Sequence, residues 1–543
     1  MPGSRDTTDP AQQTVEGKPV RLSREGRVIL AVAAASLALR VAFAAAGDIF
    51  QDEALHWWET RHPGVQFSPQ PPMASLIVQA SLAVLGHGTL ALRAGSLLWG
   101  TGAIVLAWLI GRDMFGRGVG LWAAAIVACS PLLFGIGSVT GPDAPLVFFW
   151  LLTLWTGWRA AQGESRWWWV LCGLAVAAGF YSKYMMVLAV ASAAVVLCAT
   201  RQGRALLRTP WPWVALALGV GLFAPVFLGW NVHHGWPAFR YHLGARHVWE
   251  VSPDRVAKYL GAHAGAWSPL LWVGIWVGMV TAGRLWRRGD WRGAWLGVFG
   301  ALPILFFVVP SVLTERKMLR VHWDEMGYAT GAIALAATLS PDGFRPHVRR
   351  AWRGFAVVGL ALGALTIVVF WVGSVWPRVP MALGVRPPMR QALGWRELAQ
   401  AVQKTPNWSS RPNPPPLVAD SFATMFCVGF HLRRTESMYA LAHERNAQYG
   451  MVGKLADWHA DERALVEAMA RRPGPVLYVH DHRVSGKRLR APEPTRMRRY
   501  FAEVEPLETV TVAHGDRVYR SYGLYACRGW TGRTTRLPGG KGD

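Results

Sequence analysis

Long apolar segments separated by short polar ones fill the first two thirds of the chain. The first apolar segment covers residues 28–47, and ten more follow it. A helix of about 20 apolar residues crosses the hydrocarbon core of a bilayer. The pattern therefore predicts a polytopic α-helical membrane protein with about eleven transmembrane helices, in a range of eleven to thirteen, at 28–47, 90–110, 118–137, 144–161, 167–181, 184–200, 211–230, 267–283, 294–312, 323–339 and 353–375.

The polar residues 1–27 precede the first apolar segment and end in a basic cluster of Arg21, Arg24 and Arg27. Both this leader and the apolar segment after it are long for a secretory signal peptide. We therefore expect a cytoplasmic N-terminal tail followed by a first helix that is not cleaved.

Arginines mark one side of the predicted membrane. With the N-terminus in the cytoplasm, every loop on that side is basic, in agreement with the positive-inside rule. The arginines concerned are Arg112, Arg117, Arg159, Arg166, Arg201, Arg204, Arg208, Arg284, Arg287, Arg288, Arg292, Arg345, Arg349, Arg350 and Arg353. This orientation places the long first outer loop, residues 48–89, on the extracytoplasmic side.

Composition supports the membrane class and excludes others. The chain holds 57 Lys+Arg against 33 Asp+Glu, for a net charge of +24, yet charged residues make up only 17% of it. Soluble domains carry about a quarter charged residues. The basic residues are spread over many loops, whereas a nucleic-acid-binding protein gathers them on one face. Five cysteines among 543 residues exclude a disulfide scaffold.

The character of the sequence changes after the last apolar segment. Residues 377–532 mix helix-like stretches at 394–405, 461–472 and 495–504 with β-rich runs at 416–419, 475–480, 509–513 and 518–526. Such a mixture predicts a soluble extracytoplasmic α/β domain. A disordered tail is expected at 533–543. Cys427 and Cys527 both fall in this domain, and sequence leaves open whether they pair.

Acids and cations gather at the predicted outer face. Asp52 and Glu53 follow the first span, Asp143 lies in a short outer turn, and Lys183 lies in another. The positive-inside rule predicts few cations here, so an anionic ligand is indicated. A sugar on a lipid phosphate suits this set: the leaving phosphate needs positive charge, and the acceptor hydroxyl needs a carboxylate base.

Several short motifs occur in a characteristic order. They are Asp52-Glu53-Ala54, Pro71-Pro72-Met73-Ala74, Leu92-Arg93, Pro142-Asp143-Ala144-Pro145, Ser182-Lys183-Tyr184 and the segment 230–240. This order resembles the membrane-embedded GT-C glycosyltransferases, in the dolichyl-phosphate-mannose-protein mannosyltransferase branch. Bacterial relatives in that branch add aminoarabinose or galacturonic acid to lipopolysaccharide. The resemblance covers residues 28–340 and extends more loosely beyond them.

The resemblance implies a GT-C catalytic domain at 28–376 in a bacterial inner membrane. Its expected reaction moves a sugar from a polyprenyl-phosphate donor to an envelope acceptor: lipopolysaccharide or lipid A, a protein, or another glycan. Inversion by single displacement is expected. Asp52 would be the base, and Glu53 and Asp143 would position the acceptor or bind a cation. The scheme requires no cofactor, and a divalent cation at Asp52 and Asp143 is left open.

The resemblance also suggests which residues contact the substrates. The donor phosphate would be held by basic residues at the outer face, namely Lys183, Arg240, Lys317, Arg320 and Arg93. The sequence at Arg320-Val321-His322-Trp323-Asp324 departs from the Lys and Asn-Trp-Pro pattern of the relatives. Candidate contacts to the acceptor or the sugar are His56, Tyr184, His233 and His234.

Structural roles compete with several of these assignments. Asp143 could cap the start of a helix. Lys183 could extend to the membrane interface, and His233 and His234 could be ordinary residues of that interface. Arg40, a charge inside the first span, is a functional candidate. At the level of the whole protein, the alternatives are a transporter or flippase for a polyprenyl-linked sugar, and a non-catalytic assembly protein that does not need Asp52.

Overall fold

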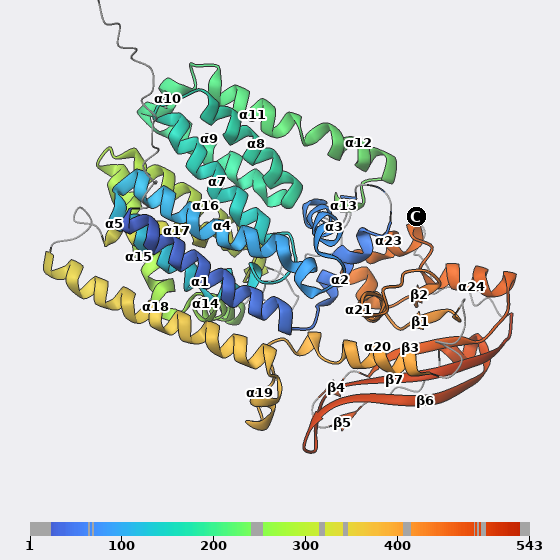
Figure 1. Cartoon of the computed structure of the whole chain (residues 1–543). Helices are drawn as coiled ribbons and strands as arrows, with labels where there is room; N and C mark the ends of the chain where they lie inside the picture. The colour runs from blue at the N-terminus through green and yellow to red at the C-terminus, as the bar shows by residue number, and fades with distance from the viewer. Residues whose placement is uncertain are drawn as a thin grey trace, which may run out of the picture.

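The computed structural model describes residues 23–532, except 63, 65, 68–69, 240–252, 314–320, 340–345, 406–413, 483, 486–487 and 490–495. A helical bundle forms most of the molecule, and an α/β part lies against one end of it (Figure 1). The helices α1 and α18 run side by side along the bundle, where Trp371 Nε1 donates to the backbone oxygen of Leu39 (3.1 Å).

Every predicted membrane segment coincides with helix. The bundle contains α1 (Arg24–Ala46), α2 (Gln51–Glu59), α3 (Met73–Leu85), α4 (Thr89–Phe115), α5 (Arg117–Ala128), α6 (Pro131–Ile136), α7 (Asp143–Ala161), α8 (Trp167–Ser182), the 3-10 helix η1 (Tyr184–Met186), α9 (Val187–Ala199), α10 (Arg201–Leu206), α11 (Trp211–Gly221), α12 (Ala224–His234), α13 (Pro237–Phe239), α14 (Pro253–Trp267), α15 (Pro269–Arg287), α16 (Trp291–Leu313), α17 (Glu325–Thr338) and α18 (Pro346–Val375).

Fewer helices than predicted are long enough to cross a membrane unaided. Among the described residues, five helices have the length and apolar character to do so, or six if the bent pair α14 and α15 counts as one span. Others are short or broken: α5 and α6, for example, divide the predicted segment 118–137. The several apolar helices agree with the predicted membrane class, and the count of eleven spans stays a prediction.

Small residues bring α17 into the centre of the bundle. All 14 of its residues are buried, and glycines mark its closest contacts with α16 and α15. A Cβ atom on Gly327 would lie 2.6 Å from the backbone oxygen of Gly300, and one on Gly278 would lie 2.4 Å from the nitrogen of Leu335. Such close approach of backbones is typical of helices packed within membranes. The first turn of α17 is thereby held firmly in place.

The intramembrane Arg40 has a structural role. Its side chain is fully buried, and Nη1 donates to the backbone oxygens of Leu133 (3.1 Å) and Phe134 (3.0 Å) in α6. Backbone carbonyls are common partners of charged residues inside membrane proteins. A Cβ atom on Gly137 would come within 2.0 Å of Nη1, so the glycine leaves the space that the guanidinium fills. Arg40, predicted as a functional candidate, joins α1 to α6.

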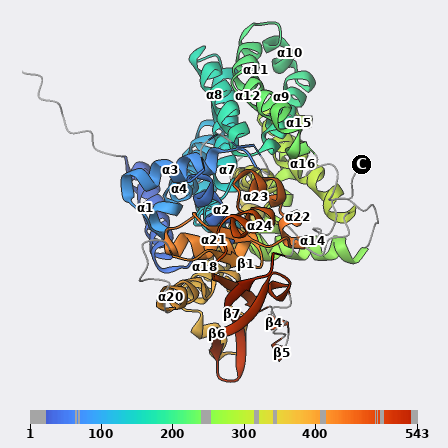
Figure 2. The same ribbon diagram turned by 90° about the vertical axis from the view of Figure 1, so that its right-hand side faces the viewer.

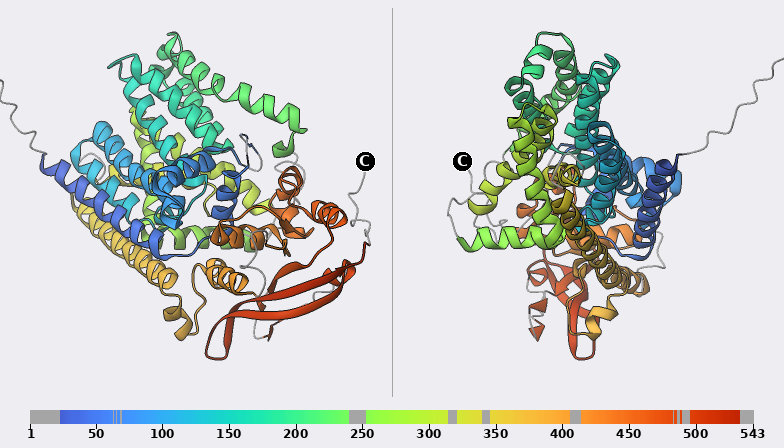
Figure 3. Two further views of the ribbon diagram at one scale, coloured as in Figure 1. Left: turned by 45° about the vertical axis from the view of Figure 1, so that its right-hand side comes forward. Right: turned by 90° about the vertical axis from the view of Figure 1, so that its left-hand side faces the viewer.

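The predicted cytoplasmic loops meet at one end of the bundle. Trp108 Nε1 donates to Glu25 (2.7 Å), and Arg159 pairs with Asp113 (3.1 Å). These contacts join the start of α1 to the ends of α4 and α7. Helices α2 and α3 lie at the other end, next to the α/β part (Figures 1 and 3).

A five-stranded sheet forms the centre of the α/β part. Its strand order is β2-β1-β3-β7-β6, with β1, β2 and β3 parallel and β7 antiparallel to both neighbours. The long β6–β7 hairpin projects from the sheet (Figure 3). The elements are α19 (Arg378–Ala382), η3 (Arg390–Ala392), α20 (Trp395–Lys404), β1 (Leu417–Ala419), α21 (Phe422–Leu432), β2 (Met438–Ala440), α22 (Glu444–Gln448), α23 (Met451–Asp457), α24 (Glu462–Arg471), β3 (Val476–His482), β4 (Val484–Ser485), β5 (Arg488–Leu489), η4 (Met497–Arg499), β6 (Phe501–His514) and β7 (Arg517–Trp530).

Alternating residues of β3 face two separate cores. Leu477 and Val479 pack in the core that includes α20 and α21, whereas Val476 and Tyr478 pack in the core that includes α24. Cys427 belongs to the first core and Cys527 to the second, and both thiols are free. The disulfide that the sequence left open is therefore not formed.

The first of these cores continues into the membrane-domain helix α2. Trp57 and Trp58 of α2 are fully buried, and Trp58 Nε1 donates to the backbone oxygen of Phe426 in α21 (3.2 Å). The ring of Trp57 meets Phe430 edge-on, with centroids 5.6 Å apart. Figure 2 shows α2 and α21 next to each other in a second view. The α/β part thus packs on α2 and holds it against the bundle.

Candidate functional site

Asp52 lies in the first turn of α2 and is exposed. The backbone nitrogen of Phe50 donates to Glu53 Oε2 (3.0 Å), which fixes the start of the helix. Arg445 of α22 also donates to Gln51 at this start. The helix dipole favours a negative charge at this position. The structure therefore presents the Asp52 carboxylate to solvent on a short helix that is held on both sides.

Glu53 lies beside Asp52 but points into the protein, where it pairs with Arg93 of α4. Arg93 Nε donates to Oε1 (2.8 Å) and Nη2 to Oε2 (2.7 Å), and both side chains are buried. Arg93 gives its remaining N–H groups to the backbone oxygens of Ala44 (3.2 Å), Gly47 (3.1 Å) and Asp48 (2.7 Å). All five guanidinium donors are then used.

The contacts of Glu53 and Arg93 differ from those that we predicted for them. Glu53 was expected to contact the acceptor or a cation, and Arg93 the donor phosphate. A buried charge requires a partner and hydrogen bonds, and here each supplies them to the other. Both residues are therefore placed to hold the end of α1 and the start of α2 in position.

Glu53 also connects α2 to the second acidic position. Its Oε1 accepts a hydrogen bond from the backbone nitrogen of Thr140 (2.9 Å), three residues before Asp143. Asp143 begins α7 and pairs with Lys183 at the end of α8, with Nζ 2.5 Å from Oδ1. The predicted residues Asp52, Glu53, Asp143 and Lys183 thus lie at the same end of the bundle.

Glu325 joins this group and was missed by sequence analysis. It begins α17, its side chain is fully buried, and Oε1 lies 4.0 Å from Lys183 Nζ. Neither of its oxygens has a hydrogen-bond partner among the described residues. Lys183 therefore lies between two carboxyl groups. The signal in the sequence was the acidic pair at 324–325, where the tenth predicted span starts.

The preceding residue, Asp324, belongs to a second buried cluster. Its Oδ1 lies 2.8 Å from His263 Nε2, and Tyr259 donates to its Oδ2. His263 Nδ1 is also 2.9 Å from the backbone oxygen of Tyr259. The two ring nitrogens of His263 thus face two different oxygens. This cluster attaches α14 to the start of α17.

The residues predicted to contact the acceptor or the sugar do not lie together. His56 is buried and bonded to Glu59 (2.9 Å), and Tyr184 donates to the backbone oxygen of Phe67. His233 and His234 are exposed at the end of α12, and the ring of His234 stacks on Trp230. No contact between these two histidines and Lys183 is found in the described part of the chain. Three predicted phosphate-binding residues lie outside that part: Arg240, Lys317 and Arg320.

Metal binding has little support from the described side chains. Within the described ranges, no three His, Cys, Asp or Glu residues are grouped as metal ligands. The predicted cation position at Asp52 and Asp143 fits poorly as well, because the ammonium group of Lys183 already neutralises Asp143. We derive no catalytic step from a cation.

Known sequences match part of this chain, including the region of Arg93, Asp143 and Lys183. Residues 69–230 match the family model of dolichyl-phosphate-mannose-protein mannosyltransferases. The lipid A galacturonosyltransferase RgtD of Rhizobium johnstonii is 22% identical over 363 residues, which cover 65% of this chain and 72% of that protein. The undecaprenyl phosphate-alpha-4-amino-4-deoxy-L-arabinose arabinosyl transferase of Erwinia tasmaniensis is 31% identical over 242 residues, which cover 41% of this chain and 42% of that protein.

Solved structures show a similar fold. The crystal structure of ArnT from Cupriavidus metallidurans in the apo state superposes with a TM-score of 0.62 at 16% identity, covering 93% of this chain and 98% of that one. The same protein bound to undecaprenyl phosphate gives a TM-score of 0.61 with the same coverage. The likeness includes both the helical bundle and the α/β part.

Proposed function

We propose that this chain, a membrane glycosyltransferase with the GT-C fold, transfers a sugar from a polyprenyl-phosphate donor to a lipid acceptor of the envelope such as lipid A. One arrangement carries the proposal: the exposed Asp52 carboxylate stands at the same end of the bundle as the Asp143–Lys183 pair, to which it is joined through Glu53 and Thr140. The names of the relatives support the classes of donor and acceptor.

Asp52 is the proposed base. Its carboxylate accepts the proton of the acceptor hydroxyl while the hydroxyl oxygen attacks the anomeric carbon of the donor sugar. The bond between that carbon and the phosphate oxygen breaks, and the polyprenyl phosphate leaves. Attack from the side opposite the phosphate inverts the configuration at the anomeric carbon. The exposure of Asp52 supports this role, because the base must reach an external hydroxyl.

Lys183 is the proposed charge for the leaving phosphate. A phosphate oxygen arriving at Nζ would take the place of the Asp143 carboxylate, while the buried carboxyl group of Glu325 stays 4.0 Å from Nζ. Positive charge placed at the leaving group stabilises the charge that develops there in the transition state. Arg240, Lys317 and Arg320 remain proposed partners of the same phosphate.

Transfer by the purified full-length chain tests this function. The donors would be synthetic undecaprenyl phosphates carrying galacturonic acid, 4-amino-4-deoxy-L-arabinose or mannose, and the acceptor would be lipid A, with product mass as the readout. We expect the mass of lipid A to rise by one sugar residue with at least one donor. No transfer from any donor would contradict the proposal, and movement of the donor across vesicle membranes without transfer would favour a flippase.

A further inference from the structure

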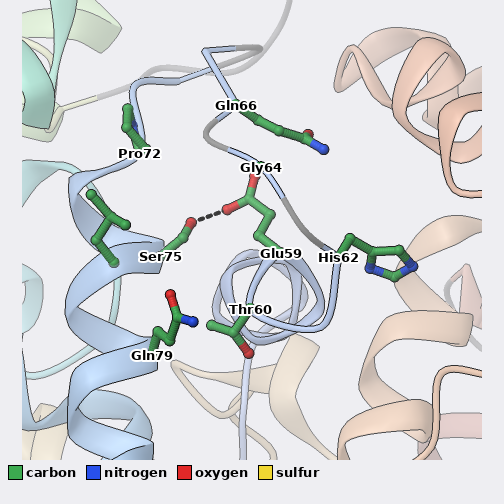
Figure 4. Close-up of a pocket in the computed structure, with 9 residues that line it drawn as sticks. Glu59, Thr60, His62, Gly64, Gln66, Pro72, Ser75 and Gln79 are labelled. Carbon is green, nitrogen blue, oxygen red and sulfur yellow. Dashed lines mark hydrogen bonds between the residues drawn. The ribbon is translucent and has the colours of Figure 1, made fainter.

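A cavity of about 200 Å³ lies between α2 and α3, beyond the catalytic end of α2. Figure 4 shows the side chains of Glu59, Ser75 and Gln79 around it, with the Ser75 hydroxyl bonded to the Glu59 carboxylate. Thr60 and Gln66 also line it, and Leu76 contributes an apolar wall. Six of the nine lining residues have side chains that can donate or accept hydrogen bonds.

The one carboxylate that lines the cavity is already paired, so the cavity does not favour a charged ligand. Its carboxylate, Glu59, is held by Lys454 of α23 and by His56. Burial raises the pKa of Glu59, but the ammonium group of Lys454 and the His56 ring outweigh burial, so that the pKa falls below its usual range. Because Lys454 balances the charge of Glu59, the cavity offers no unpaired positive charge to an anion and no unpaired negative charge to a cation. No lysine or arginine is found among the lining residues.

Two lining amides are available to a ligand. No hydrogen bond joins the side chain of Gln66 or Gln79 to another residue in the described parts of the chain. An amide offers both donors and acceptors, as vicinal hydroxyl groups require. The lining therefore suits a neutral molecule rich in hydroxyl groups, and the volume suits one monosaccharide ring better than a large ligand.

The cavity is placed in line with the proposed base. Asp52, His56 and Glu59 are spaced at i, i+4 and i+7, so they lie on one face of α2. Seven residues of helix span about 10 Å, a distance that two linked sugar rings can bridge between Asp52 and the cavity. His62 also lines the cavity, and its ring is stacked on Trp458 of the α/β part (4.4 Å between centroids).

We propose that this cavity is a subsite for an uncharged sugar ring of the acceptor, adjoining the sugar whose hydroxyl group reacts at Asp52. The assignment rests on the proposed function, because it takes the acceptor to be a glycolipid. It deepens that function by naming the part of the acceptor that the protein recognises: a hydroxyl-rich neutral ring, bound by amides and a carboxylate.

Binding of simple sugars tests the subsite without turnover. The full-length protein in detergent would be titrated with methyl β-D-glucopyranoside, glucuronate and inorganic phosphate, and binding followed by ligand-observed NMR. The variants are Gln79→Ala, Leu76→Trp and the control Gln202→Ala, which replaces an exposed glutamine on α10, away from α2 and α3 (Figures 1 and 2). We expect the neutral glycoside to bind more tightly than either anion.

The variants give the decisive outcomes. Gln79→Ala should weaken binding about fivefold, as loss of one hydrogen bond does, while Leu76→Trp should abolish it and Gln202→Ala should leave it unchanged. With lipid A as acceptor, Leu76→Trp should raise the KM for lipid A and leave the donor KM unchanged. Equal glycoside binding by Leu76→Trp and wild type, tighter binding of glucuronate, or a change in donor KM alone would overturn the subsite. Since binding needs no catalysis, an inactive protein that binds the glycoside contradicts only the proposed function.

Discussion

The guanidinium of Arg93 and the carboxylate of Glu53 form a buried pair joined by two hydrogen bonds of 2.8 and 2.7 Å. Next to it in sequence, Asp52 faces solvent. The two adjacent acids therefore have different surroundings, because neighbouring residues on a helix point about 100° apart. Glu53 fixes the start of the helix, and Asp52 is the proposed base.

The buried pair predicts a large effect on stability. Glu53→Gln leaves the Arg93 charge buried without its partner, which costs about 3–5 kcal/mol. We expect a clear loss of thermal stability in detergent. The control is Glu505→Gln, which removes an exposed pair with Arg528 and should change stability by less than about 1 kcal/mol. Similar melting temperatures for both variants would contradict the assigned role of Glu53.

A second prediction concerns stability when the space at Gly137 that the Arg40 side chain fills is taken by another group. Gly137→Ala places a methyl group where the Arg40 guanidinium lies, and overpacking of this kind costs about 1–3 kcal/mol. Gly135→Ala is the matched control, because a Cβ atom there meets nothing within 4 Å. Thermal unfolding should therefore separate the two variants. An unchanged Gly137→Ala protein would show that Arg40 does not need its present position.

The proposed role of Lys183 predicts that its substitution lowers kcat/KM for the donor. Lys183→Met removes the charge proposed to meet the phosphate, and kcat/KM for the polyprenyl-phosphate sugar should fall about 10- to 100-fold. Lys258→Met, which changes an exposed lysine on α14, serves as the control. Steady-state transfer assays with varied donor would measure both. Equal kcat/KM values for the two variants would remove Lys183 from the phosphate site.

The buried carboxyl group of Asp420 in the α/β part should make the stability of the fold depend on pH. Asp420 follows β1, and burial, with the nearby Asp481 carboxylate, raises its pKa to about 6. The usual pKa is about 3.9 in an unfolded chain. The folded state therefore binds the proton more tightly, so this group stabilises the fold below about pH 4 and the contribution is lost as the pH rises through about 6.

The size of this effect is about 3 kcal/mol for a shift of about two pKa units. Wild type should lose this stability between pH 4 and 7, whereas Asp420→Asn, which does not titrate, should show a flatter profile. Thermal melts of both proteins across that range provide the comparison. Parallel profiles for the two proteins would contradict the assignment to Asp420.

The fold was predictable where one physical signal dominates. Apolar length located the helices, and runs rich in β-forming residues located β1, β3, β7 and part of β6. The predicted helix-like stretch 495–504 was wrong in its last four residues, which begin β6. The packing that shortens or breaks helices was not predictable, because it depends on tertiary contacts such as the close approach of Gly278 to Leu335. A count of spans from hydropathy alone therefore differs from a count of long helices.

The candidate site was predictable in part. Motif order identified Asp52, Asp143 and Lys183, and the structure places them at one end of the bundle. Sequence could not show that Glu53 points inward to Arg93, since adjacent residues on a helix differ by about 100° in direction. It also missed Glu325, whose relation to Lys183 depends on how α17 packs against α7 and α8.

The most direct test of the account is the transfer rate of Asp52→Asn. The substitution keeps the size of the side chain and leaves the Glu53–Arg93 pair in place, so the protein should fold like wild type. Loss of a general base predicts a fall in kcat of about 10²- to 10⁴-fold, while Asp516→Asn, at the exposed β6–β7 turn, should keep full activity. A folded Asp52→Asn protein that transfers sugar at the wild-type rate would contradict the account.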